Sequence, residues 1–133
     1  GKLAPSSFGY YISLLSEFYN RAAVMAERNN HGHALLLWLK DNSNCKLLKG
    51  HDKKQGWLSS SVGKNKMYTA TAEALRDKTA TIRSRIVYSQ LQSIEGTTLR
   101  APGGDMDDCA DAFALAIVGR DKVKSQRILV AAI

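Results

Sequence analysis

Near the start of the chain, apolar side chains recur at intervals of three and four residues. This is the spacing of one helix face, and it predicts an amphipathic helix that begins after a serine cap. The apolar positions of this face are Phe8, Tyr11, Ile12, Leu15, Phe18 and Tyr19. Residues 22–26 then form a short apolar run typical of a buried strand, with Glu27 at its carboxyl end. We therefore expect the first helix to lie on a sheet.

The middle of the chain alternates turn chemistry with weaker periodicity. Residues 29–32 predict a turn and residues 34–39 a second helix, and residues 45–58 indicate a hairpin or a long pair of loops tipped with lysines. Residues 59–66 have the composition of a flexible basic segment before a helix over 67–78. A short strand at 81–82 and a helix from a cap at Ser84 to Leu91 complete this part.

The most informative pattern lies between residues 103 and 118. Four carboxylates, Asp105, Asp107, Asp108 and Asp111, occupy seven residues directly before a run that is almost wholly apolar. A helix that is apolar all round is normally buried, so its acidic start should open beside the core. Asp108 and Asp111 are three residues apart, which places them on one helix face.

Two interpretations of these acids stay open. Acidic residues favour the start of a helix because they cap its free amides and interact with its dipole, and Asp105 could serve as the cap. Four neighbouring carboxylates also repel one another unless a cation neutralises them. Oxygen ligands of this kind suit a divalent ion, and the pattern favours Mg²⁺ or Mn²⁺.

Glu27 is a candidate for a second carboxylate of the same site. In open α/β sheets, functional groups collect at the carboxyl ends of strands, which is where the expected strand places Glu27. The alternative is a salt bridge with Arg28 or another nearby base.

The positive charge is concentrated in one part of the chain. The net charge is +7, from 19 Lys and Arg against 12 Asp and Glu, and residues 28–66 hold eight basic residues but only two acidic ones. Such a surface is either simply solvated or suited to the phosphates of double-stranded DNA, and an adjacent carboxylate metal site favours DNA. The residues that we expect to contact DNA are Arg28, Lys46, Lys49, Lys53, Lys54, Lys64 and Lys66.

Length and composition set broader bounds. With 133 residues and 44% hydrophobic content, the chain is expected to form a single domain spanning residues 1–133. No apolar run is long enough for a membrane span and no signal peptide is visible, so no membrane partner is expected. Two cysteines suit neither a disulfide framework nor a zinc site, and they are consistent with a reducing cytoplasm.

Three blocks of the sequence together resemble a known family. They are YNRAAVMAERNNHG at 19–32, GWL at 56–58 followed by KNKMYTATAEAL at 64–75, and APGGDMDDCADA at 101–112. In this order they are similar to the nuclease domain of the large terminase subunit of tailed bacteriophages and prophages. Met106 stands where that family usually has a histidine, which removes a polar neighbour but no preferred metal ligand.

The resemblance implies a fold and an activity. The fold would be ribonuclease H-like α/β, with a mixed sheet flanked by helices that lacks the N-terminal strands of the full domain. The activity would be endonuclease cleavage of double-stranded DNA concatemers during genome packaging, with two Mg²⁺ or Mn²⁺ ions. Glu27 and Asp108 match the family's catalytic carboxylates. The resemblance implies that Asp108 holds one metal ion and that Glu27, aided by Asp107 or Asp111, holds the second, so all four carboxylates are expected metal ligands.

The resemblance also implies partners and missing parts. The family's first catalytic aspartate lies on a hairpin upstream of the first helix expected here, so the isolated chain is expected to be weakly active or inactive. No phosphate loop is found, so no ATPase motor is expected within the chain. The implied partners are double-stranded DNA, the terminase ATPase domain, the small terminase subunit and the portal, in the cytoplasm of a bacterial host.

Two other functions stay open. A resolvase-like or integrase-like nuclease of the same superfamily would use similar carboxylates on branched DNA or transposon ends. Alternatively, the chain could bind DNA or dock to a protein without any activity of its own.

Overall fold

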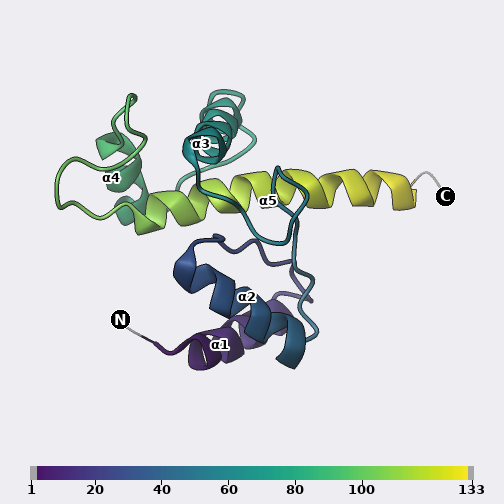
Figure 1. Ribbon diagram of the computed structural model, residues 1–133. Helices are drawn as coiled ribbons and strands as arrows, with labels where there is room; N and C mark the ends of the chain where they lie inside the picture. The colour runs from purple at the N-terminus through teal and green to yellow at the C-terminus, as the bar shows by residue number, and fades with distance from the viewer. Residues whose placement is uncertain (1–2, 132–133) are drawn as a thin grey trace. The chain divides into compact units, whose positions relative to one another are not determined.

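The computed structural model of the chain describes residues 3–131, with the side chains of residues 3–29 and 31–123. Regular structure in this range is helical (Figure 1). The helices are α1 (Pro5–Phe18), α2 (Asn30–Asn42), α3 (Ser61–Arg76), α4 (Arg85–Ser93) and α5 (Asp108–Ala131). The chain divides into two compact units, one made of Gly1–Ser59 with Lys122–Ile133 and the other of Ser60–Asp121. This division describes how the residues pack and does not test whether the chain is one domain. The single-domain organisation therefore stays a prediction.

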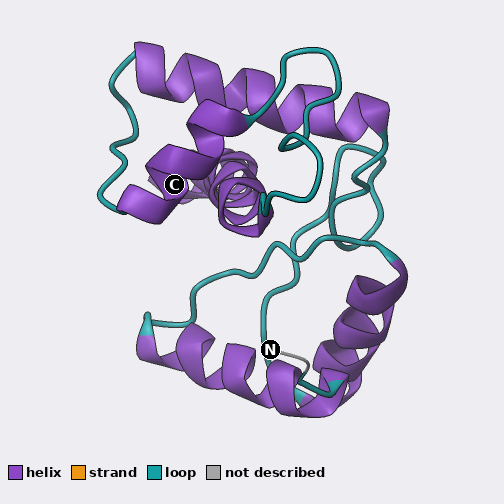
Figure 2. Ribbon diagram, turned by 90° about the vertical axis from the view of Figure 1, so that its left-hand side faces the viewer, coloured by secondary structure: helices purple, strands orange, loops and turns teal. Residues whose placement is uncertain are grey.

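The resemblance to ribonuclease H-like domains predicted a mixed sheet, and this prediction is wrong. Within residues 3–131 the extended segments meet only in isolated bridges, and Figure 2 shows loops where strands were expected. The predicted strand at 22–26 is extended but forms only isolated bridges. At Val24 the N–H donates to Lys46 and the carbonyl accepts from Leu48, and at its carboxyl end Glu27 forms a second bridge with Trp57. A sheet needs longer ladders and at least three strands to stabilise itself.

In the first unit, α1 packs against α2 through an unexpected face (Figure 1). Gly9 and Ser16 are the buried residues of α1, while Phe8 and Phe18 of the predicted inner face are exposed. A side chain at position 9 could not be accommodated, because a Cβ built there would lie 2.3 Å from the ring of Trp38. The small residues therefore allow the two helices to approach closely, and the prediction that α1 lies on a sheet through its aromatic face is wrong.

The core of this unit is supplied mainly by α2. Leu35, Leu36 and Leu39 are buried together with Ala26 of the extended segment. The carbonyl of Ala26 accepts a hydrogen bond from the N–H of Trp57 at 2.8 Å, which brings the chain after the lysine-tipped turn back against this core. The turn and its basic residues are thus anchored to the extended segment that packs on α2.

The second unit contains α3, α4 and most of α5. The buried apolar residues are Met67 and Ala74 of α3 and Ala110, Ala114, Leu115, Ile117 and Val118 of α5. The expectation that the apolar helix is buried holds for these positions, although Ala112 and Ala116 are exposed.

Two local expectations in this unit fail and one holds. Residues 61–66, expected to be flexible, form the first turns of α3, because the Ser60 hydroxyl accepts a hydrogen bond from the N–H of Gly63 and caps the helix. No strand forms at 81–82. Ser84 caps α4, as predicted, by accepting from the N–H of Val87. Among the described residues, no helix is both long enough and apolar enough to cross a membrane.

The packing of α2 leads to a stability prediction. Leu39 is fully buried in the core of the first unit, so Leu39→Ala should lower the free energy of unfolding by about 2–5 kcal/mol through lost burial and a residual cavity. Leu37→Ala is the matched control, since Leu37 lies on the same helix with 58% of its surface exposed, and it should change the free energy by less than about 0.5 kcal/mol. Urea denaturation followed by circular dichroism measures both, and equal losses would contradict this assignment of the core.

Candidate functional site

A tight turn delivers the chain to the acidic start of α5. The N–H of Asp105 donates to the carbonyl of Pro102 at 3.0 Å, and Gly104 between them has a φ of +89°. This is the pattern of a type II turn, which requires a positive φ at its third position and therefore favours glycine there. Asp105 is exposed within this turn and α5 begins only at Asp108. The prediction that Asp105 caps the helix is therefore wrong.

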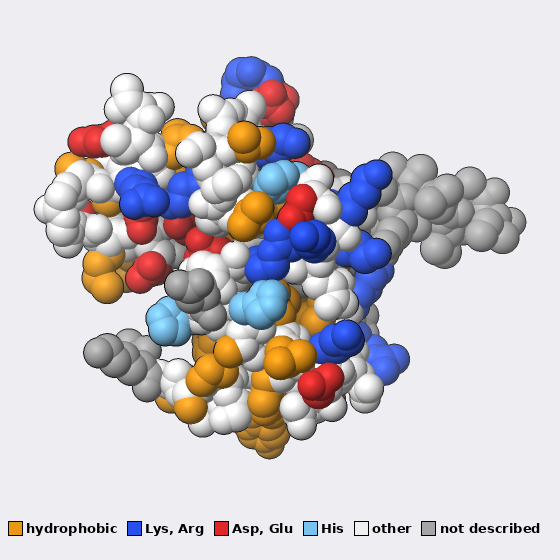
Figure 3. Space-filling view, in the orientation of Figure 1, with side chains coloured by type: hydrophobic (Ala, Val, Ile, Leu, Met, Phe, Trp, Pro, Cys, Tyr) orange, Lys and Arg blue, Asp and Glu red, His pale blue; other side chains and the backbone are white. Residues whose placement is uncertain are grey.

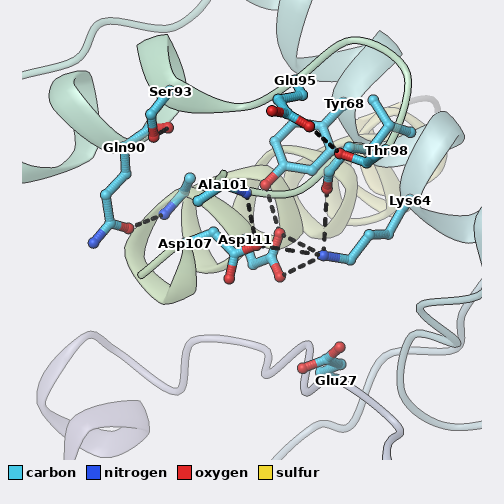
Figure 4. Close-up of polar contacts among 12 residues, drawn as sticks. Glu27, Lys64, Tyr68, Gln90, Ser93, Glu95, Thr98, Ala101, Asp107 and Asp111 are labelled. Carbon is cyan, nitrogen blue, oxygen red and sulfur yellow. Dashed lines mark hydrogen bonds and ion pairs between the residues drawn. The ribbon is translucent and has the colours of Figure 1, made fainter. Parts of the chain in front are cut away.

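The free amides at the start of α5 are capped from another helix. The side-chain oxygen of Gln90 on α4 accepts hydrogen bonds from the N–H groups of Cys109 at 2.8 Å and Ala110 at 3.1 Å. Figure 4 shows Gln90 reaching to the beginning of α5. Since these amides are satisfied by an amide oxygen, the carboxylates near them are left to interact with other groups.

Asp107 and Asp111 converge on one cation, the ammonium group of Lys64 on α3 (Figure 4). Its Nζ lies 3.1 Å from Asp111 Oδ2 and 3.9 Å from Asp107 Oδ2, and it also donates to the carbonyl of Leu99 at 3.5 Å. The hydroxyl of Tyr68, one helical turn after Lys64, donates to Asp111 Oδ1. We call Lys64, Tyr68, Asp107 and Asp111 the α5 cluster.

The α5 cluster is shielded from solvent. The side chains of Lys64, Asp111 and Asp107 are 12%, 15% and 24% exposed. Asp107 also accepts a hydrogen bond from the N–H of Ala101 at 3.4 Å, which ties the preceding loop to the cluster. A positive charge held between two half-buried carboxylates offsets their mutual repulsion, which is the electrostatic problem posed by the acidic sequence.

The four acids of this segment are therefore divided between two environments. Asp107 and Asp111 point into the α5 cluster, whereas Asp105 and Asp108 are exposed to solvent. Asp108 lies in the first turn of α5, where the helix dipole favours a negative charge. Among the side chains that the structure describes, no three His, Cys, Asp or Glu residues gather as a metal-binding group.

Glu27 belongs to the other unit and is half-buried. Its Oε2 accepts a hydrogen bond from Asn29 Nδ2 at 2.9 Å, and the carboxamide oxygen of Asn29 caps α2 by accepting from the N–H of Gly32 at 2.8 Å. The alternative of a salt bridge with Arg28 is not realised, because Arg28 pairs with a different acid.

That acid is Asp52, in the basic turn that follows. The two terminal guanidinium nitrogens of Arg28 donate to the Asp52 carboxylate, and this hydrogen bonding, more than any other cause, holds the pKa of Asp52 below its ordinary value. The turn itself closes through hydrogen bonds between the N–H of Gly50 and the carbonyl of Lys54 and between the N–H of Lys53 and the carbonyl of Gly50.

The predicted DNA-contacting residues thus fall into two groups. Lys46, Lys49, Lys53, Lys54 and Lys66 are exposed. Arg28 and Lys64 are instead engaged in ion pairs within the protein. Lys49, Lys53, Lys54 and Lys66 extend into solvent and are placed to reach a phosphate, whereas Arg28 and Lys64 would first have to leave their ion pairs.

Sequence reasoning missed Tyr68 and Gln90. Tyr68 could have been suspected, because it lies four residues after Lys64 and such residues share a helix face. No sequence signal identifies Gln90, since its role depends on the position of α4 beside α5.

Comparison of the chain with protein-family models, with curated proteins and with solved structures gave no match.

The capping role of Gln90 is testable. Gln90→Ala should lower the free energy of unfolding by about 1 kcal/mol, because two amides at the start of α5 lose their acceptor. Gln92→Ala removes an equivalent side chain from the same helix at an exposed position and should cost less than about 0.5 kcal/mol. Chemical denaturation measures the difference, and an equal cost for both variants would argue against the cap.

Proposed function

We propose that the chain provides carboxylate ligands and DNA contacts of a divalent-metal-dependent endonuclease that acts on double-stranded DNA. The observation that carries the proposal is the convergence of Asp107 and Asp111 on a single shielded cation. The assignment to DNA cleavage is supported by the three blocks of resemblance to terminase nuclease domains. It does not depend on the ribonuclease H-like sheet, which is absent from the described residues.

The donor chemistry of the α5 cluster suits Mg²⁺ or Mn²⁺. Carboxylate oxygens are the ligands that these ions prefer, and two of them are already oriented toward one point by Tyr68 and Ala101. Lys64 occupies that point and offsets part of their charge. A divalent ion bound there would compete with Lys64, so this lysine would set how tightly the ion is held.

Each carboxylate has a proposed role. Asp107 and Asp111 orient the cation, and exposed Asp108 supplies a carboxylate that can face a substrate. Glu27 is proposed as a catalytic carboxylate on the strength of the resemblance alone. Bound metal would supply activation of the attacking water and stabilisation of the leaving oxygen, so no lysine or histidine need act as a base.

The basic turn supports contact with the DNA backbone. Lys49, Lys53 and Lys54 are exposed around a turn whose shape is held by the Arg28–Asp52 pair. Lysines at such positions bind phosphates through charge and do not distinguish bases. We therefore propose binding that is independent of sequence.

One specific observation favours the second candidate, a DNA-binding module without activity. Lys64 already pairs with both Asp107 and Asp111, and this ion pairing suffices if the α5 cluster serves stability alone. A resolvase-like or integrase-like nuclease is a further alternative. The terminase ATPase domain, small subunit and portal as partners, and the cytoplasm of a bacterial host, are likewise proposals from the resemblance.

Activity provides the decisive test. The chain should nick supercoiled plasmid DNA slowly with Mn²⁺ or Mg²⁺, and Asp108→Asn and Glu27→Gln should each remove most of this activity. Asp105→Asn is the matched control, since it removes an exposed acid from the same segment and should leave the nicking rate within about twofold. Plasmid relaxation on agarose gels, with and without chelator, measures the rates.

The metal can be tested separately from the chemistry. Isothermal titration calorimetry should show that the chain binds Mn²⁺ and that Asp111→Asn weakens this binding. Lys64→Met should strengthen it, because methionine has a similar length but no charge that competes with the metal ion. DNA binding without metal binding or nicking, in protein with a native circular dichroism spectrum, would favour the inactive module. Nicking that survives both carboxylate substitutions would sink the assigned site.

DNA binding should depend on the basic turn. Replacing Lys49 and Lys54 with Ala and Lys53 with Asn, which tolerates the φ of 64° at that position, should weaken duplex binding equally for unrelated sequences. Each lost phosphate contact should flatten the plot of log binding constant against log salt by roughly 0.9. Fluorescence anisotropy at several salt concentrations measures this slope.

A control with the same loss of charge separates local contact from net charge. The control changes three exposed basic residues of the second unit, Lys78, Arg83 and Arg85. The substitutions Lys78→Asn, Arg83→Ala and Arg85→Ala together remove three positive charges. The control should change the slope far less than the turn variant does. An equal change would mean that DNA responds to overall charge and not to this turn.

A further inference from the structure

The outer face of α1 is apolar along its whole length. Tyr10, Tyr11, Leu14, Leu15 and Phe18 lie on the side of α1 turned away from α2 and all are exposed, Phe18 at 79% and Tyr10 at 60%. Figure 3 shows hydrophobic side chains gathered at the lower end of the molecule, where α1 lies in Figure 1. We call these five residues, together with the exposed Phe8 and Tyr19 at the two ends of the helix, the α1 stripe.

The orientation of α1 is the reverse of that in an ordinary surface helix. Gly9 and Ser16 are the buried residues of α1, with Ile12 packed beside them against the core of α2, and Ser16 is held by a hydrogen bond from its hydroxyl to the carbonyl of Ala22 at 2.7 Å. An amphipathic helix normally turns its apolar side to the core. Because the small residues make the contact with α2, the aromatic side is left for another surface.

The size of the stripe matches a protein interface. Taking about 200 Å² for each fully exposed side chain, the exposed fractions of the seven residues leave on the order of 800 Å² of their surface accessible. The largest apolar patch on a typical monomer is about 300–600 Å², and one side of a stable interface buries about 800 Å². The accessible area of the α1 stripe is therefore larger than the largest apolar patch of a typical monomer, and it is enough for one side of a stable interface.

The lack of charged side chains on the α1 stripe limits the kinds of partner that it can bind. Glu17 is the only charged residue of α1, and it lies beside the stripe. Nucleic acid requires basic side chains, and helices that lie on membranes carry Lys or Arg along their polar face. An uncharged surface rich in tyrosine and phenylalanine fits an equally uncharged protein surface, and a second copy of α1 presents one.

We infer that the α1 stripe is a homodimer interface, in which two copies of α1 pack antiparallel about a twofold axis. A twofold contact requires a self-complementary patch. The stripe meets this requirement, because its aromatic ends, Phe8 and Phe18, lie on either side of a centre of Leu14 and Leu15. The inference is independent of the proposed nuclease function.

Sedimentation velocity of the full chain over micromolar to hundred-micromolar concentrations tests the interface. The chain should form a dimer with a dissociation constant in the micromolar range, and Phe18→Glu and Tyr11→Glu should each raise that constant by at least roughly tenfold. Both side chains are exposed in the monomer, so the circular dichroism spectrum of the variants should be unchanged.

Tyr88→Glu is the matched control. Tyr88 is a tyrosine of α4 with 54% exposure, outside the α1 stripe, and its replacement should leave the dissociation constant unchanged. A monomer at all concentrations would overturn the inference and leave another polypeptide as the occupant. An equal effect of Tyr88→Glu, or growth into open-ended assemblies, would overturn it as well.

Discussion

The second unit depends on one electrostatic constraint, the presence of two half-buried carboxylates at the start of α5. Asp107 and Asp111 can be held this close only with a positive charge between them, and Lys64 supplies it from α3. Tyr68 adds a hydrogen bond to the same carboxylate. Since the cation comes from one helix and the acids from another, the ion pairs that solve the charge problem also connect α3 to α5.

Capping of α5 from α4 complements this arrangement. With Gln90 satisfying the first amides of the helix, the aspartates do not need to fold back onto their own backbone. Asp107 and Asp111 can therefore turn toward Lys64. The same geometry has two chemical consequences, since carboxylates preoriented around a lysine form a stable ion-pair cluster and also a set of oxygen ligands that a divalent ion could take over. Which consequence matters depends on the competition between the lysine and the ion.

The first unit is governed by packing instead of charge. Gly9 allows the ring of Trp38 to contact the α1 backbone, and this close approach directs the serine face of α1 inward. The aromatic side chains are then turned outward, so the local packing of one glycine produces the exposed α1 stripe. In the same unit, the pairing of Arg28 with Asp52 removes one predicted DNA contact but holds the turn that presents Lys53 and Lys54.

The sequence by itself located helices where local chemistry decides, although α1 lacks its expected serine cap and α3 begins at Ser61, before its expected start. Apolar periodicity located α1, an almost wholly apolar run indicated that α5 is buried over much of its surface, and a serine placed the start of α4, because these signals involve residues only a few positions apart. The acidic start of α5 and the lysine-tipped turn were likewise visible as composition. These features require no knowledge of distant residues.

Tertiary structure decided the rest. The expected sheet failed because strand pairing depends on distant partners, and the extended segments here meet in bridges that are too short to form one. The direction of the α1 face followed from Trp38, a residue on another helix that periodicity does not reveal. Lys64 changed from an expected phosphate contact to an internal cation because α3 brings it to Asp111, and Gln90 became a cap because α4 lies beside α5. In each case the sequence supplied the side chain, and only the packing of separate elements selected its partner.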